Sequence, residues 1–336
     1  MSTAKFEKII RSLQKNPREY MKQLAKNKNP KFNPKHEKYF AKKEEINPEK
    51  IKLELELVND KKTSEIFKSA MSFWSVPLSE GYGRRMKFIL WDKTHNKVFG
   101  IFGLCDPLLG LRVRDEYIGW NRKQKEDRLY NLMTAYVLGA VEPYGELFGT
   151  KMVALATGSK EVCKLFEEKY KGKKTVIKEK TPIPKLVVVD TMAFYGKSLI
   201  YEGLREWKLL GFTKGQTHIH LDELWDECLN LAEKLKIKGL EKVKAKHGHN
   251  WRFKVGSTWK FRIWKDVFSQ LGISKKYLFT GLTKGYYFRP LAENWREFLK
   301  GETDEVIYVN KSFDEYFEIW KDKYLRRRLR KWSRGF

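Results

Sequence analysis

The chain has 336 residues, of which 41% are hydrophobic, so it can bury a sizeable core and is not a disordered or fibrous protein. It carries 69 Lys and Arg against 42 Asp and Glu, a formal net charge of +27. That excess is more than solubility requires and indicates a polyanionic partner, for which nucleic acid is the first expectation. Three scattered cysteines and the lack of any long apolar run predict a cytoplasmic protein that does not cross a membrane.

Residues 1–50 are rich in lysine and are predicted to form a basic arm. Apolar residues recur at helical spacing from Phe6 to Leu13, which predicts a short amphipathic helix. The residue before a proline disfavours the helical conformation, so interruptions are predicted at three pairs: Asn29-Pro30, Asn33-Pro34 and Asn47-Pro48. The arm either contacts nucleic acid or is a solvated, weakly ordered extension.

A folded domain is predicted over residues 51–221, beginning where apolar and polar residues alternate. This alternation is typical of strands with one buried face. The first expected elements are a strand over 51–58, a helix over 67–73 capped by Thr63 or Ser64, and paired strands over 85–92 and 97–104 joined by a turn.

The segment 111–120 crowds two arginines, two acids, a tyrosine and a tryptophan between predicted strands. We name Asp115 and Tyr117 as candidate catalytic groups, and Arg112 and Arg114 as candidate contacts to nucleic acid. A structural ion pair between Arg114 and a neighbouring acid explains the same residues without any chemistry. Both interpretations stay open.

A buried strand over 132–141 is followed by a glycine-containing turn and a helix over 150–156. Free backbone N–H groups and the positive end of the helix dipole then meet in one place, which suits a phosphate. Gly145, Gly149 and Thr150 are therefore the candidate cofactor-binding residues, although the sequence does not identify the cofactor. A plain connection between strand and helix is the alternative.

The rest of this domain supplies two more polar groups beside the central strands. Asp190 and Tyr195 complete the candidate catalytic set, because polar side chains at the ends of central strands gather at one edge of a sheet. The expected elements are a helix over 159–170, a basic loop over 171–180, a strand over 185–191, a helix over 198–210 that ends at Gly211, and a strand from Phe212 to Leu221.

A second kind of chemistry is suggested by two histidines that alternate on the last of these strands. His218 and His220, together with Asp222, form a candidate site for a divalent metal. The Tyr286-Tyr287 pair then offers a nucleophile, in the manner of enzymes that nick single strands. A motif of three residues also arises often by chance.

Residues 222–336 form the third predicted part, in which cations and aromatic rings interleave. Rings stack on exposed bases while Lys and Arg meet the backbone, so nucleic-acid contacts are expected from this run: Trp251, Arg252, Lys254, Lys260 and Arg262. Trp259, Ile263 and Val267 also fit the core face of a helix, and we expect a mixture of the two roles. Residues 324–334 are strongly basic and are expected to contact phosphates through Arg326, Arg327, Arg328 and Arg330.

Six runs of the chain carry a family resemblance, and they lie at residues 114–120, 128–131, 136–141, 190–201, 248–252 and 290–299. As a set they resemble the DruA-type proteins of the Druantia anti-phage system. The likeness covers about residues 67–301. It implies a role in anti-phage defence or mobile-element biology, DNA as the nucleic-acid partner, and a helicase as a protein partner.

The predicted order of strand, strand, strand, turn, helix, strand, helix, strand resembles that of the GNAT acetyltransferases. The expected fold class is therefore α/β (α+β), with a GNAT-like central mixed sheet flanked by helices. The chain departs from the acyl-CoA loop of true GNAT enzymes, because Glu146 stands where phosphates would lie. A transferase that modifies nucleic-acid bases and a GNAT-shaped body that only binds both remain open.

Overall fold

A computed structural model describes residues 3–79, 81, 83–175, 179–214, 221, 224–255, 257–278 and 282–332. The chain divides into two compact units. The helical unit comprises Met1–Asn27, Ser75–Pro77 and Lys214–Thr283, and the sheet unit comprises Lys28–Trp74, Leu78–Thr213 and Lys284–Phe336. Each unit therefore combines stretches that are distant in sequence, whereas the sequence predicted three contiguous parts.

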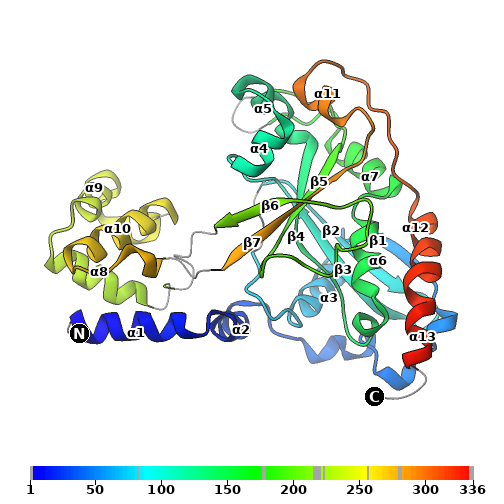
Figure 1. Ribbon diagram of the computed structural model, residues 1–336, viewed down its shortest axis with the longest axis horizontal. Helices are drawn as coiled ribbons and strands as arrows, with labels where there is room; N and C mark the ends of the chain where they lie inside the picture. Colours follow the sequence, from blue (N-terminus) through cyan, green and yellow to red (C-terminus); the bar gives the residue numbers. More distant parts are fainter. Residues whose placement is uncertain are drawn as a thin grey trace. The chain divides into compact units, whose positions relative to one another are not determined.

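Seven strands of the sheet unit form one sheet in the order β1-β2-β3-β4-β5-β7-β6 (Figure 1). Neighbours from β1 to β4 are antiparallel, β4 and β5 run parallel, and β5 and β7 are antiparallel. The bounds are β1 Leu53–Leu57, β2 Arg85–Asp92, β3 Lys97–Cys105, β4 Leu132–Ala140, β5 Val188–Ala193, β6 Lys208–Lys214 and β7 Thr283–Pro290. The predicted mixed sheet flanked by helices is confirmed.

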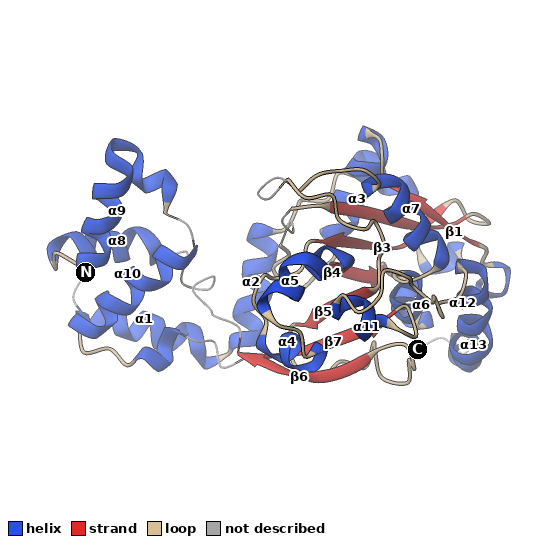
Figure 2. Ribbon diagram, turned by 90° about the horizontal axis from the view of Figure 1, so that it is seen from above, coloured by secondary structure: helices blue, strands red, loops and turns tan. Residues whose placement is uncertain are grey.

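Helices of the sheet unit form two groups. In one group, α6 packs on β3 and β4, and α12 packs on α6; in the other, α11 packs on α4 and α5 (Figures 1 and 2). The bounds are α3 Lys61–Met71, α4 Arg112–Ile118, α5 Arg122–Arg128, α6 Gly149–Ala156, α7 Lys160–Tyr170, α11 Trp295–Lys300, α12 Phe313–Trp320 and α13 Arg326–Trp332. Within the residues that the structure describes, no helix has the length and apolar character of a membrane span.

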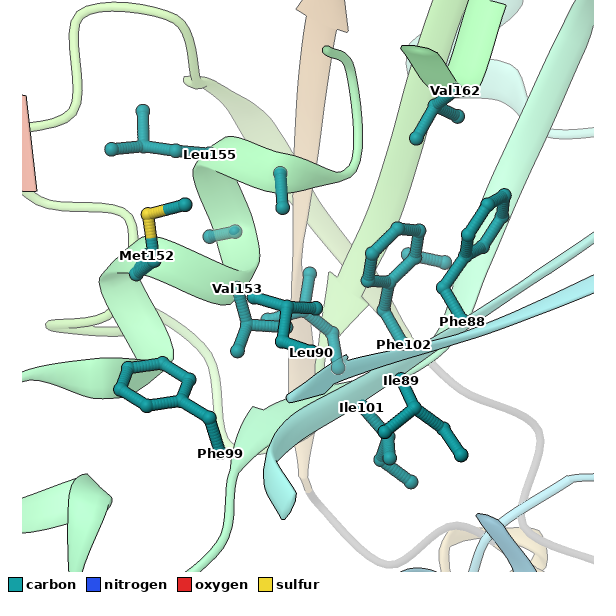
Figure 3. Close-up of a cluster of buried hydrophobic side chains, with 14 of the residues drawn as sticks. Phe88, Ile89, Leu90, Phe99, Ile101, Phe102, Met152, Val153, Leu155 and Val162 are labelled. Carbon is teal, nitrogen blue, oxygen red and sulfur yellow. The ribbon is translucent and has the colours of Figure 1, made fainter. Parts of the chain in front are cut away.

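The main core of the sheet unit is built on β2, β3 and α6 (Figure 3). Phe88 of β2 and Phe102 of β3 lie opposite each other in register, and their rings stack with centroids 4.6 Å apart. Every residue of α6 except Thr150 is buried, so this short helix is held by packing and not by its own length. Burial on all sides explains why the run from Gly149 is almost free of charged residues.

Residues 198–207 form turns, so the predicted helix over 198–210 is wrong. The Lys151 ammonium donates hydrogen bonds to the carbonyl oxygens of Leu199, Ile200 and Glu202, at 2.7, 3.0 and 2.6 Å. A helix would have used those carbonyls internally. Burial lowers the pKa of Lys151, and only the Glu202 carboxylate opposes that shift. Tertiary contacts have therefore overridden the local helical pattern.

Local capping differs from prediction at one helix and adds a role for two of the asparagines that precede proline. The N-terminus of α3 is capped by Asp60, whose carboxylate accepts a hydrogen bond from the Thr63 backbone N–H at 2.9 Å. The predicted cap at Thr63 or Ser64 is wrong by a few residues. Asn33 and Asn47 each cap a short 3₁₀ helix that begins with proline, η1 Pro34–Tyr39 and η3 Pro48–Lys50.

The helical unit has a core of its own. Ile10 of α1 shares that core with Cys228 of α8 and with Trp264 of α10, so part of the predicted arm is a structural element of this unit. The helices are α1 Thr3–Lys15, α2 Pro17–Lys28, α8 Trp225–Lys234, α9 Lys238–His247 and α10 Ser257–Gln270, with the 3₁₀ helix η7 Gly248–Lys254 before α10.

Candidate functional site

A buried cluster of charged groups in the sheet unit is centred on Arg114. This side chain is fully buried and donates to Asp115 Oδ1 at 2.8 and 2.9 Å, and to the carbonyl oxygens of Leu108 and Leu109 at 2.7 and 3.4 Å. Its guanidinium also lies over the Trp120 ring. The prediction that Arg114 contacts nucleic acid is therefore wrong, and the alternative of a structural ion pair holds.

Asp190 joins this cluster from the centre of the sheet. It lies opposite Thr134 in the parallel β4–β5 pairing and accepts a hydrogen bond from the Thr134 hydroxyl. The Tyr286 hydroxyl donates to its other oxygen at 2.7 Å. Burial raises the pKa of Asp190, while the positive charge of Arg114 and the two hydroxyl donors oppose that rise.

Asp115 lies beside the same guanidinium, but its pKa is shifted in the opposite direction. Burial alone would raise the pKa of Asp115, but Arg114, Lys125 and the Leu111 backbone N–H together lower it. The pKa values of two carboxyl groups near one cation are thus shifted in opposite directions, a pattern found in acid–base pairs and in structural networks alike. Asp190 is only 1% exposed and Arg114 is fully buried, so these two groups tie α4 to the central strands from inside the sheet unit.

The other predicted catalytic groups have different surroundings. The Tyr117 ring stacks on Trp295 with centroids 5.6 Å apart, and its hydroxyl is 3.2 Å from the Lys208 ammonium. Tyr195 follows β5 and its ring contacts Phe194. The structure therefore brings Asp115 and Asp190 together around Arg114 and places both tyrosines among other partners.

Neither tyrosine of the Tyr286-Tyr287 pair is placed as a nucleophile. Both side chains are buried, with the Tyr286 hydroxyl bonded to Asp190 and the Tyr287 hydroxyl accepting the Ser198 backbone N–H at 2.8 Å. Burial and then the Asp190 charge raise the pKa of Tyr286, so this hydroxyl stays protonated and acts as a donor. The metal-site residues predicted with them, His218, His220 and Asp222, lie outside the described residues.

The turn predicted to bind a cofactor phosphate is closed by protein groups. An added Cβ at Gly149 would lie 2.6 Å from the Tyr144 carbonyl oxygen and 2.9 Å from the Ala140 Cβ, so glycine serves close packing here. Thr150 accepts the Ala140 backbone N–H through its hydroxyl at 3.1 Å. The N-terminus of α6 therefore contacts other protein atoms at both Gly149 and Thr150.

Two acids flank the same turn. Glu142 approaches Gly145 so closely that a Cβ there would lie 2.5 Å from its carboxylate, and Glu146 pairs with Lys43 at 2.7 Å. Burial and then the nearby Glu146 charge raise the pKa of Glu142. A phosphate at Gly145 would meet negative charge, which weighs against the predicted cofactor role.

Predicted nucleic-acid contacts in the helical unit divide between surface and core. Ile263 and Val267 are fully buried, as expected for the core face of a helix, while Arg252 and Arg262 are exposed. Each of three tryptophans has a cation of this unit near its ring: Lys244 and Arg252 at Trp251, Lys260 at Trp225, and Arg262 at Trp259. The side chain of Lys254 is outside the described residues.

The basic C-terminal helix presents some of its arginines and packs others. Arg326 and Arg327 are exposed, and Arg326 pairs with Asp322 at 3.1 Å. The Arg328 guanidinium lies 4.1 Å from the centre of the Phe148 ring and is half-buried. The side chain of Arg330 is not among those described. Arg112, on α4, is 89% exposed and pairs with Glu116.

Positive charge is concentrated in the helical unit. Its 100 residues contain 21 Lys and Arg against 9 Asp and Glu, a net charge of +12. The sheet unit contains 48 against 33 over 236 residues, a net charge of +15. The charge per residue is thus nearly twice as high in the helical unit.

Comparison with known proteins identifies the family. The family model described as "Druantia protein DruA" matches residues 5–301. The chain belongs to the DruA family. One curated member, Druantia protein DruA from Escherichia coli (strain UMEA 4076-1), is 33% identical over 277 residues, which cover 80% of this chain and 67% of that protein. No solved structure matches the chain. The predicted DruA-type resemblance is confirmed, and the family match includes residues of both units.

The Arg114 cluster yields a stability prediction. Arg114→Leu should lower the free energy of unfolding by about 3–5 kcal/mol at pH 7, because it removes the cation beside the buried Asp190 carboxyl group and takes one of two cationic partners from the half-buried Asp115. A carboxyl group with a raised pKa in the folded state destabilises the protein as pH rises. The stability deficit of Arg114→Leu should therefore shrink as the pH is lowered from 7 to about 4. Urea unfolding across this range measures it. The exposed Arg112→Leu is the control and should change little; equal losses in both variants would contradict the account.

Proposed function

We propose that this DruA family member binds DNA in anti-phage defence and acts with a helicase partner. The observation that carries the DNA-binding part is the charge of +12 in the 100 residues of the helical unit. A chain with this excess gains free energy by replacing the counterions condensed on a nucleic acid. The defence role rests on membership of the DruA family, and the helicase partner rests on that resemblance alone.

Exposed cations support the proposal at the level of single residues. Most buried cations of the sheet unit, such as Arg114, are used up in internal hydrogen bonds. By contrast, Lys238, Lys242 and Lys246 of α9 are exposed, as is Arg327 of α13. Lysines that project into solvent from a packed helix can approach phosphates without any rearrangement of the core.

Salt dependence tests this function. The observed affinity for a 20-bp DNA duplex should fall linearly with salt on a log–log plot, with a slope of about −4 or steeper, because each phosphate contact contributes about −0.9. Fluorescence anisotropy from 50 to 300 mM NaCl measures the slope. A slope near zero would contradict an electrostatic mode, and failure to bind any nucleic acid would refute the proposal. Co-purification with a co-expressed helicase of the same system tests the partner separately.

A second candidate is a GNAT-like transferase that modifies nucleic-acid bases. The strand order β1-β2-β3-β4-β5-β7-β6, with β4 and β5 as a parallel pair, favours a GNAT-like arrangement. The acids Glu142 and Glu146 at the β4–α6 turn weigh against a bound acyl-CoA. We therefore favour a GNAT-like fold that binds no acyl-CoA and contacts nucleic acid through exposed cations.

Cofactor retention separates the two candidates. The DNA-binding proposal predicts that isothermal titration of the purified protein with acetyl-CoA gives no heat at ligand concentrations up to about 1 mM, the weak end of ordinary affinities. Native mass spectrometry should likewise find no mass added by an acyl-CoA. Saturable binding of acetyl-CoA, lost when Gly149 is replaced by a bulkier residue, would establish the transferase candidate instead.

A further inference from the structure

Two helices of the helical unit, α8 and α9, are joined by a turn of only three residues (Figure 1). The turn closes α8 with two hydrogen bonds, from the Ile237 N–H to the Ala232 carbonyl oxygen at 2.9 Å and from the Lys236 N–H to the Glu233 carbonyl oxygen at 3.1 Å. Lys236 takes the left-handed conformation, with φ of 50°. This is the Schellman pattern, and it redirects the chain sharply into α9.

One face of α9 is fixed against α10. Leu240 and Val243 are fully buried in the same core as Ile263 and Trp264 of α10. Gly239 is also buried on this face, and an added Cβ would lie 3.0 Å from the Asp266 carboxylate of α10. The orientation of α9 about its own axis is therefore set by packing within the helical unit.

The exposed face of α9 is basic. Lys238, Lys242 and Lys246 are exposed and recur every four residues, so they lie along one stripe of the helix. The helix contains four lysines and one acid, and that acid, Glu241, is 3.6 Å from Lys244. The structure records no ion pair between the three stripe lysines and any described residue.

We propose that α8 and α9 form a helix–turn–helix module in which α9 lies in the major groove of duplex DNA. This rests on the proposed DNA-binding function and specifies its substrate as a duplex. A ten-residue helix is about 15 Å long and 10–12 Å wide with its side chains, and the major groove is about 12 Å wide. The stripe lysines then reach the phosphates at the groove edge.

The surrounding aromatic residues favour a duplex over a single strand. Binding of single strands needs ring faces that are open to bases. Trp251 is partly buried and has the Lys244 ammonium and the Arg252 guanidinium each 5.4 Å from its ring centre. Trp264 is fully buried. The rings therefore build the module, and the lysines of α9 remain as its contact groups.

The test removes the positive charges of the three stripe lysines. Lys238→Gln, Lys242→Gln and Lys246→Gln combined should weaken binding of a 20-bp duplex by about tenfold at 150 mM salt and reduce the magnitude of the log–log salt slope by about 2.7, or 0.9 per contact. The control variant combines Lys61→Gln, Lys68→Gln and Lys164→Gln, which removes the same charge from exposed positions of the sheet unit. A thermal melt checks that each variant is folded.

Four outcomes would overturn the inference. Equal losses in the stripe and control variants would mean that only total charge matters. If the stripe variant binds DNA as tightly as the parent, and the parent binds with a strong salt dependence, the interface lies elsewhere on the protein. The proposed function would then still stand. Tighter binding of the matching single strand, with the salt slope reduced by about 0.7 for each lost contact, would mean that the substrate is a single strand and not a duplex. Absence of nucleic-acid binding by the parent would refute the proposed function itself.

A crosslinking measurement gives an independent readout that needs no lysine substitution. All three natural cysteines are buried, so a cysteine introduced at the exposed Ala245 is labelled selectively with a photocrosslinker. Ala245→Cys should crosslink to the duplex, and Ser269→Cys on the exposed face of α10 should not. Equal crosslinking at both positions, or none at Ala245→Cys, would contradict a groove-bound α9.

Discussion

The sheet unit depends on buried cations that donate hydrogen bonds to backbone carbonyl oxygens. Arg114 binds the carbonyls of Leu108 and Leu109, and Lys151 binds three carbonyls of the turn that precedes β6. Arg289 of β7 donates to the carbonyls of Ala154 and Leu155 at 2.8 and 2.7 Å, which satisfies the C-terminal end of α6. Each cation thereby holds irregular or terminal backbone in place through its carbonyl oxygens.

These interactions divide the positive charge of the chain into two populations. Cations such as Arg114, Lys151 and Arg289 are buried and donate hydrogen bonds to groups of the same unit, so they are unavailable to a ligand. The helical unit has the higher charge per residue, and among its described lysines Lys238, Lys242 and Lys246 are exposed. The same residue types therefore stabilise the sheet unit from inside and give the helical unit its excess of positive charge.

Local patterns allowed much of the fold to be predicted. The strands over 85–92 and 97–104, and the helix from Gly149, follow from alternation and apolar runs, because burial of a face leaves a period in the sequence. The turns at residues 198–207 were not predictable, since the Lys151 ammonium that holds them is 48 to 51 residues away along the chain. A pattern within one segment carries no trace of such a distant donor.

The same limit applies to the candidate sites. Charge counts cannot distinguish a buried Arg114 from an exposed Arg112, although the crowding of acids around Arg114 did suggest the ion pair. The roles of Tyr286 and Arg289 were missed, because partners such as Asp190 come together only through the sheet pairing. The lysine stripe of α9 left a signal in the sequence, a four-residue repeat of Lys at 238, 242 and 246, that becomes interpretable once Leu240 and Val243 are known to face the core.

Chemical footprinting of lysines tests the division of charge most directly. The protein is treated with an amine-acetylating reagent, with and without a saturating DNA duplex, and acetylation is measured at each lysine by mass spectrometry. The account predicts that the duplex protects Lys238, Lys242 and Lys246, while the exposed Lys61 and Lys164 of the sheet unit stay reactive. Protection confined to the sheet unit, or spread evenly over all exposed lysines, would contradict it.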